Sequence, residues 1–207
     1  MAVAAARRSV IAVRIGHDHF AVWRIAAGLA AALVPGATPL LDAEGGWLLH
    51  AAVEFRSCRL FGVPVPGRLH SAAWLVPCQG RHDGLANALV RRCIGHPLLP
   101  TGILLAGWST ARIRIDGDSF CVVGSTWARA RPGLPDHDLA WFDRDRGGLL
   151  PDAGGWRPWS IAKREWRWRA RSADLGPAPW PARPVGLITV VPTVARWCIP
   201  VRLFGTR

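Results

Sequence analysis

Apolar and polar residues alternate along much of this chain, and the alternation predicts a fold made mostly of β-strands. Residues 9–15 (SVIAVRI) predict a first strand. Residues 20–34 instead place Trp, Ala and Leu at helical spacing, which predicts a helix that ends just before Pro35. Residues 47–55 (WLLHAAVEF) follow a glycine turn and predict the next strand.

Strands and turns also dominate the rest of the pattern. Further strands are predicted at residues 69–77, 108–115, 119–127, 161–171, 186–191 and 196–204. Asp116-Gly117 is a strong hairpin signal between the second and the third of these. Residues 85–94 (LANALVRRCI) predict a helix, and residues 129–155 predict a long connection rich in Pro, Gly, Asp and Arg. No internal repeat or linker divides the pattern, so residues 1–207 are predicted to form one domain.

The composition argues against two classes of protein. Hydrophobic residues make up 50% of the 207 residues and charged residues 19%, a balance that excludes intrinsic disorder. No apolar run reaches the roughly 18 residues that a membrane-spanning helix needs, so no membrane association is predicted. Residues 25–33 (IAAGLAAAL) are similar to the core of a signal peptide, but they follow a polar segment and no clean cleavage site follows them.

The charge admits more than one interpretation. The formal net charge is +12, carried by 25 Arg and one Lys. A basic chain can bind a polyanion such as nucleic acid, and the Arg- and Trp-rich residues 156–207 are the candidate surface, with Arg164, Arg167, Arg169 and Arg171 in its centre. A GC-rich coding sequence also replaces Lys with Arg, and the alternation in WRWR equally predicts a half-buried strand, so nucleic acid is the weaker alternative. The 12 Trp and the absence of Tyr leave a third interpretation open, a poorly constrained reading frame.

Five isolated cysteines argue for a reducing compartment. They are Cys58, Cys78, Cys93, Cys121 and Cys198, without a CxxC pair. An odd number without metal-ligand spacing predicts reduced thiols, mostly buried, in a cytoplasmic protein. Only Cys78, His82 and Cys93 come near a zinc-site spacing, and core cysteines with a surface histidine are the simpler interpretation. No metal and no cofactor is predicted.

Three stretches resemble a known bacterial family. They are residues 33–42 (LVPGATPLLD), 47–66 (WLLHAAVEFRSCRLFGVPVP) and 157–162 (RPWSIA). In this order they are similar to the YqjF-like family, which itself resembles acetoacetate decarboxylase in fold. The resemblance implies an α+β fold, in which a mostly antiparallel sheet forms a barrel-like, acetoacetate-decarboxylase-type core with one or two helices. Residues 68–76 depart from the family's pattern, so the resemblance does not carry over an active site.

The decarboxylase resemblance implies a chemistry that needs a lysine. In those enzymes an amine of lowered pKa forms a Schiff base with a β-keto acid, and the iminium accepts the electrons released with carbon dioxide. The only lysine here is Lys163, and the neighbouring charge of Arg164 would lower its pKa. It lies late in the chain, whereas decarboxylase lysines lie in the middle, so a solvated lysine on a strand is the alternative.

The strand at residues 47–55 carries the main candidate site. His50 and Glu54 are four residues apart and therefore share one face of a strand. Buried there, they would need partners, which Arg56 or Arg59 could supply. A pocket lined by His50, Glu54, Arg56 and Trp would bind a small carboxylated or polar ligand. The alternative is a structural ion pair at a strand edge.

Two histidine tracts are weaker candidates. Asp136-His137-Asp138 could form an acid/base pair, but neighbouring residues rarely point the same way, and a turn is predicted. His17-Asp18-His19 would place two histidines on one face of a strand, as a metal site requires, but no third ligand is in view and an exposed turn is predicted.

The sequence therefore predicts a cytoplasmic small-molecule-binding protein, or a degenerate enzyme-like one, whose ligand lies inside the core. A keto-acid lyase using Lys163 and a nucleic-acid-binding protein remain the alternatives. Catalysis and oligomeric state stay open.

Overall fold

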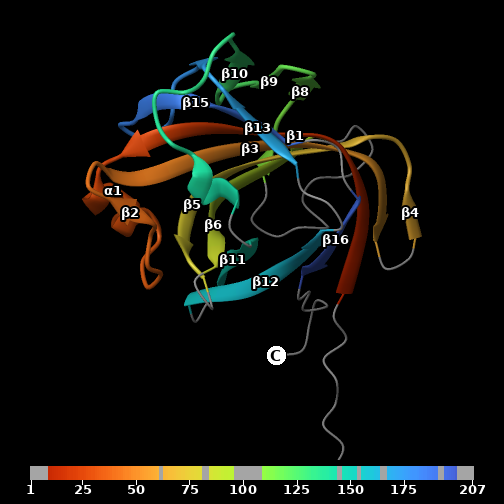
Figure 1. Ribbon diagram of the computed structural model, residues 1–207. Coiled ribbons are helices and arrows are strands. Elements are labelled where there is room, and N and C mark those ends of the chain that lie inside the picture. The colour runs from red at the N-terminus through yellow and green to blue at the C-terminus, as the bar shows by residue number, and fades with distance from the viewer. Residues whose placement is uncertain are drawn as a thin grey trace, which may run out of the picture.

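Strands dominate the fold of this chain. The structure is a computed structural model, and it describes residues 9–60, 63–80, 84–95, 109–143, 146–152, 155–163, 167–190 and 194–199. These residues form a 12-stranded sheet and a 4-stranded sheet, with one α-helix and one short 3-10 helix (Figure 1). The prediction of a mostly antiparallel sheet with a helix is confirmed. The closure of that sheet into a barrel-like core is not confirmed and stays a prediction.

The main sheet runs through most of the chain. It contains β1 (Ser9–Ile25), β2 (Leu41–Asp42), β3 (Gly45–Leu60), β4 (Val63–Val65), β5 (Leu69–Gln79), β6 (Leu85–Gly95), β7 (Ser109–Thr110), β11 (Arg146–Asp152), β12 (Gly155–Lys163), β13 (Trp168–Arg171), β15 (Arg183–Val190) and β16 (Val194–Ile199). The small sheet contains β8 (Ile113–Asp116), β9 (Ser119–Val122), β10 (Trp127–Ala130) and β14 (Ala173–Leu175). The helices are α1 (Ala27–Leu33) and the 3-10 helix η2 (Ala140–Asp143).

The two longest strands, β1 and β3, form the spine of the main sheet (Figure 1). They pair antiparallel from Ile11 opposite Leu60 to Ile25 opposite Gly46. On the far edge of β3 lies β5, followed by β6, while the far edge of β1 pairs with β16 along its first half and with β15 along its second. The register shifts where Gly16 forms a bulge in β1, and a bulge of this kind strengthens the local twist of a strand.

Apolar side chains are buried on both faces of this spine. On one face a first core joins the main sheet to the small sheet and α1, and its largest buried side chains include Trp23, Trp74 and Phe120. On the other face a second core contains Phe20 and Phe142, the latter from η2. A strand that is covered on both faces is expected to be apolar at nearly every position, as residues 20–23 of β1 are.

The predicted helix at 20–34 is a strand in its first part, and the predicted helix at 85–94 is a strand throughout. Residues 20–25 belong to β1. Phe20 and Val22 enter the second core, whereas Ala21 and Trp23 enter the first. Successive residues are therefore buried on opposite faces, as in a strand and not in a helix. Only the residues after Ala26 form the helix, which ends before Pro35 as predicted. Residues 85–94 form β6, where ladders to β5 and β11 replace the helical hydrogen bonds.

The hairpin about Asp116-Gly117 is confirmed as β8 and β9. Its second arm ends at Val122, and a turn leads into β10 as a separate strand. The predicted connection at 129–155 is wrong in part, because it contains η2 and β11. The predicted strand at 161–171 is divided between β12, which ends at Lys163, and β13, which begins at Trp168.

Candidate functional site

Polar residues line one face of three adjacent strands, and three of them, His19, His50 and Glu54, are buried while His17 and His70 are half-buried. We name this set the histidine face; it consists of His17 and His19 of β1, His50 and Glu54 of β3, and His70 of β5. Glu54 stands opposite both His17 and His70, and His50 stands opposite Ala21 and Trp74. The shared face predicted for His50 and Glu54 is therefore present.

His50 is a buried imidazole without a polar partner at one nitrogen. The residue is 1% exposed, and its Nδ1 makes no hydrogen bond within the described residues. Its ring centroid lies 4.3 Å from that of Trp74 and 5.5 Å from that of Phe120. Burial lowers the pKa of His50 to about 3, so the ring is neutral at pH 7. A neutral imidazole has one donor and one acceptor, and leaving a buried polar atom unpaired costs about 1–3 kcal/mol.

Glu54 is a buried carboxylate held by cations. Arg56 Nε lies 3.3 Å from its Oε1, and Arg68 Nη1 and His70 Nε2 lie 3.4 and 3.6 Å from its Oε2. Burial alone would raise the pKa of the Glu54 carboxyl, but the Arg56 hydrogen bond, the charges of Arg68 and His17 and the His70 contact together lower it. The predicted partnership with Arg56 is present, whereas Arg68 and His70 were not foreseen.

Gly16 makes room for this carboxylate. A Cβ placed on Gly16 would overlap Glu54 Oε1 and would come within 2.6 Å of Arg56 Nε. The bulge therefore brings bare backbone against the Glu54–Arg56 pair, a close approach that only glycine permits.

His19 was predicted to lie in an exposed turn, and that prediction is wrong. The residue is fully buried in β1, with its Nε2 2.9 Å from the backbone oxygen of Asp116 and its Nδ1 3.1 Å from Thr189 Oγ1. A carbonyl can only accept, so Nε2 carries the proton and the Thr189 hydroxyl donates to Nδ1. Burial lowers the pKa of His19, so the ring is neutral and ties β1 to the β8–β9 turn.

The two histidines of this tract do share a face, as the strand alternative required. The rings of His17 and His19 are stacked with centroids 6.1 Å apart. No group of three or more possible metal ligands occurs among the described residues. The strand signal at residues 9–15 leads into this tract, but Gly16 and Asp18 are poor strand formers, so local reasoning missed the continuation of the strand through His17 and His19.

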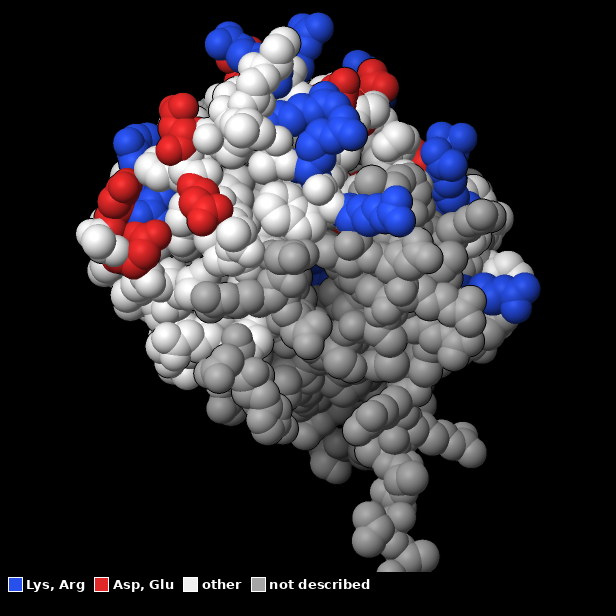
Figure 2. Space-filling view, in the orientation of Figure 1, with Lys and Arg blue, Asp and Glu red and all other residues white. Residues whose placement is uncertain are grey.

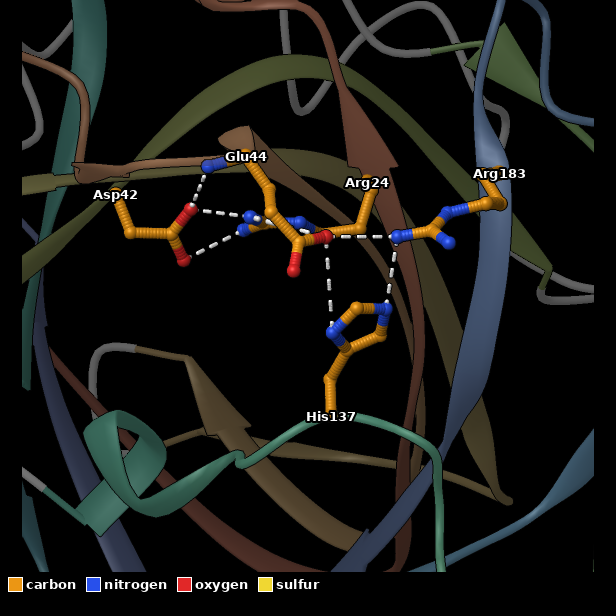
Figure 3. Close-up of polar contacts among 5 residues, drawn as sticks. All are labelled: Arg24, Asp42, Glu44, His137 and Arg183. Atoms are coloured by element: carbon orange, nitrogen blue, oxygen red, sulfur yellow. Dashed lines mark hydrogen bonds and ion pairs between the residues drawn. The ribbon is translucent and has the colours of Figure 1, made fainter.

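A second polar network joins the end of β1 to the connection before η2 (Figure 3). Arg24 bonds both carboxylate oxygens of Asp42, and Glu44 Oε2 accepts a 2.8 Å hydrogen bond from Arg183 Nη2. Arg183 Nη2 also lies 2.9 Å from His137 Nε2. The charges of Arg24 and Arg183 balance those of the two carboxylates. The Arg24 guanidinium also lies 4.0 Å from the centroid of the Trp47 ring, so the network packs on an aromatic surface.

The aspartates beside His137 are not its partners. The nearest charged groups to its ring are Glu44 and Arg183, which come from other elements. Asp138 Oδ1 accepts the backbone N–H of Ala140 at 2.8 Å and so caps η2. The predicted turn is therefore present, and an Asp-His-Asp acid/base pair is not.

The remaining candidates lie wholly or partly outside the described residues. Lys163 ends β12 opposite Ala195, and its side chain is not among those described, nor are Arg164 and His82. Burial raises the pKa of the Cys78 thiol to about 11, as expected for a core cysteine.

On the face shown in Figure 2, basic side chains alternate with acidic ones among the described residues. Arg171 is half-buried and lies 2.7 Å from Asp118, while Arg167 and Arg169 are exposed. Among the described residues, no helix has both the length and the apolar character needed to cross a membrane.

The fold is similar to that of solved acetoacetate-decarboxylase-like structures. MppR, an enduracididine biosynthesis enzyme, complexed with the condensation product of pyruvate and imidazole 4-carboxaldehyde, superposes with a TM-score of 0.56 at 13% identity, over 93% of this chain and 88% of MppR. An acetoacetate decarboxylase-like enzyme from Sphingomonas wittichii RW1 gives 0.57 at 10% identity, over 92% and 91% of the two chains. An acetoacetate decarboxylase structure gives 0.54 at 12% identity, over 92% and 86%.

These similarities establish the fold alone, because every identity is below 25%. No family model matches the chain, and no curated protein sequence does either. The predicted similarity in fold to acetoacetate-decarboxylase-like structures is therefore confirmed. Membership of the YqjF-like family is not confirmed.

Proposed function

We propose that this protein binds a small organic acid in an acetoacetate-decarboxylase-type core, with His50, Glu54 and Arg56 as the ligand-binding residues. The observation that carries the proposal is the buried His50 ring, whose Nδ1 has no hydrogen-bond partner among the described residues. A ligand hydroxyl or carbonyl beside this ring would supply the missing partner.

The cations around Glu54 supply the acid-binding part of the proposal. Arg56 and Arg68 each contact Glu54 through one nitrogen, and their side chains are 51% and 67% exposed. A guanidinium has five N–H donors, so each keeps donors for a second carboxylate. Glu54 fixes the two arginines in place, and its single negative charge leaves them with a net positive charge.

The strand pairings support a ligand enclosed by the sheet. Starting from β1, the succession β3, β5, β6, β11, β12 and β16 pairs neighbour with neighbour, and β16 pairs again with β1. A barrel-like curl of these strands would set the histidine face around an interior space. MppR, a protein of the same fold, is complexed with a small molecule, which supports a small-molecule ligand for this chain.

Binding of small organic acids by calorimetry tests the proposal. We expect pyruvate or acetoacetate to bind the wild-type protein and acetone, which lacks the carboxylate, to bind more weakly. Arg56→Gln should lower the affinity about 10- to 100-fold, because a hydrogen bond to a charged group contributes about 1.5–3 kcal/mol. Arg114→Gln on the small sheet is the control with the same change of charge, since Arg114 is exposed and far in sequence from the histidine face. Equal affinities in the two variants would contradict the proposal.

A decarboxylase-type lyase is the second candidate, favoured by the fold shared with acetoacetate decarboxylase. It requires Lys163 to reach the same ligand and to form a Schiff base with its keto group. Covalent trapping on Lys163 distinguishes this lyase from a protein that only binds.

A further inference from the structure

The segment between β14 and β15 lies across the first core, beside the aromatic rings that contact His50. Residues 176–182 (GPAPWPA) alternate in burial: the three prolines are exposed, while Ala178, Trp180 and Ala182 are half-buried and pack against the first core. Residues 179–181 form a bend, and the segment as a whole keeps its prolines towards solvent and an apolar side towards the core. We name residues 176–182 the strap.

The strap is fastened at its ends. The N–H of Gly176 donates to the carbonyl of Trp127 at 2.8 Å, and Arg183, the first residue after the strap, pairs with Arg24 in the main sheet. Between these points, no main-chain hydrogen bond joins residues 177–182 to the rest of the described chain. Proline has no N–H, so every second residue of the strap is unable to donate one. Side-chain packing holds the middle, which can therefore lift without breaking a strand ladder.

Trp180 is the side chain that connects the strap to the candidate site. Its ring stands edge-to-face on Trp74, with centroids 5.8 Å apart and planes at 89°. Trp74 is 2% exposed, and its ring lies 4.3 Å from that of His50. Trp180 itself is partly exposed, so the three rings form a continuous row from the surface to the buried imidazole.

The strap reaches His50 only through Trp74, whereas Phe120 contacts the His50 ring directly and is held more firmly. Phe120 lies over the His50 ring from β9, which is hydrogen-bonded to β8 and β10. The turn of the β8–β9 hairpin is also tied down by His19, whose Nε2–H donates to the Asp116 carbonyl. Displacing the strap therefore breaks fewer hydrogen bonds than displacing β9.

We infer that the strap is the gate to His50 and that Trp180 determines which ligands pass. A ligand reaches the histidine face when the strap lifts and the Trp180 ring leaves Trp74. The identity of the ligand rests on the proposed function, whereas the gate belongs to the fold and can be tested without a ligand.

Carbethoxylation of histidine by diethyl pyrocarbonate, mapped by peptide mass spectrometry at pH 7, tests this inference. The reagent modifies neutral imidazoles, and His50 is neutral at this pH, so a change in its rate between variants reports a change in access. In the wild-type protein we expect slow modification of His50 and faster modification of His70, whose side chain is 25% exposed. Trp180→Ala should raise the rate at His50 about tenfold and leave His70 unchanged, because the edge-to-face contact is lost and the strap opens more often.

Two further variants make the result specific. Trp156→Ala removes another half-buried tryptophan packed on the first core, whose indole N–H donates to the Pro35 carbonyl at 2.7 Å, and should leave His50 protected. Trp180→Phe keeps an aromatic ring on Trp74 and should stay near the wild-type rate. Trp180→Leu gives the same test as Trp180→Ala should the smaller side chain prevent folding.

The inference that the strap is a gate is contradicted if the modification rate of His50 in folded Trp180→Ala or Trp180→Leu equals that in the wild type. It is also wrong if Trp156→Ala raises the rate at His50 equally. These outcomes are separate from those for ligand binding. A raised modification rate at His50 in a protein that binds no organic acid would support the gate and contradict the proposed function. Binding of an organic acid together with an unchanged modification rate at His50 in the Trp180 variants would support the proposed function and contradict the gate.

Discussion

The ring of His50 lies 4.3 Å from that of Trp74 on the neighbouring strand, and its Nδ1 is unpartnered within the described residues. His19, one row away on β1, is equally buried but has both ring nitrogens bonded. The two imidazoles therefore differ in what they contribute to the fold. His19 fastens a hairpin, while His50 costs stability unless something binds it.

Replacing each histidine by leucine separates these roles. His50→Leu should leave the free energy of unfolding unchanged or raise it by about 1 kcal/mol, because it removes a buried polar atom without a partner. His19→Leu should lower it by about 1–3 kcal/mol, because the Thr189 hydroxyl and the Asp116 carbonyl lose their partner. Urea unfolding of both variants measures the difference. A loss for His50→Leu as large as that for His19→Leu would make His50 a structural residue.

The same histidines predict how stability depends on pH. The pKa of His50 is lowered to about 3 by burial, and that of His19 is lowered for the same main reason. Below about pH 6.5 the unfolded chain binds protons at these rings while the folded protein does not, so stability is present above that pH and is lost as pH falls. Each ring contributes a slope of up to about 1.4 kcal/mol per pH unit. His50→Leu should reduce the slope between pH 6 and pH 4, as measured by urea unfolding at each pH, and an unchanged slope would show that His50 is protonated in the folded protein.

Glu54 predicts a second pH effect with a different window. Its pKa is lowered in the folded protein, so its contribution is full above its unfolded pKa of about 4.3 and is lost as pH falls through the folded value. Glu54→Gln should lower the unfolding free energy at pH 7 by about 1–2 kcal/mol, less than for a fully buried pair because Arg56 and Arg68 are more than half exposed. The variant should lose less stability than the wild type between pH 5 and pH 3. An equal loss in that window would show that Glu54 has no effective cationic partner.

The close contacts at Gly16 and the open surroundings of Gly28 predict opposite effects of alanine on stability. Gly16→Ala should lower the unfolding free energy by about 1–3 kcal/mol, because its Cβ displaces Glu54 and Arg56. Gly28→Ala is the matched control: Gly28 lies in α1 with nothing within 4 Å of its Cβ position, and alanine there should stabilise by up to about 1 kcal/mol. Thermal unfolding of the two variants tests both signs. A neutral Gly16→Ala would mean that the bulge does not carry the Glu54–Arg56 pair.

Lys163 gives a chemical prediction for the lyase candidate. Borohydride reduction in the presence of acetoacetate should add the mass of the reduced adduct at Lys163 if that lysine forms a Schiff base. Lys163→Arg keeps the charge and should abolish the adduct. Wild-type protein without an adduct would remove the lyase and leave the binding function.

The sequence predicted β3, which is buried on both faces, and failed in β1, where the apolar residues also have helical spacing. The pattern WLLHAAVEF placed β3 correctly, and with it the shared face of His50 and Glu54. Phe20 and Trp23 imitate a helical stripe, yet they point into different cores, which only the tertiary arrangement reveals. The bonds from His19 to Asp116 and from Arg68 to Glu54 span 97 and 14 residues, so no local pattern could predict them.

Native mass spectrometry of the purified wild-type protein and His50→Leu tests the central claim most directly. A small acid held at the histidine face should appear as extra mass on the folded wild-type protein, should leave on unfolding, and should be absent from folded His50→Leu. After addition of acetoacetate, a wild-type protein that stays bare, or one that carries the same mass as His50→Leu, would contradict the claim that this face binds a ligand.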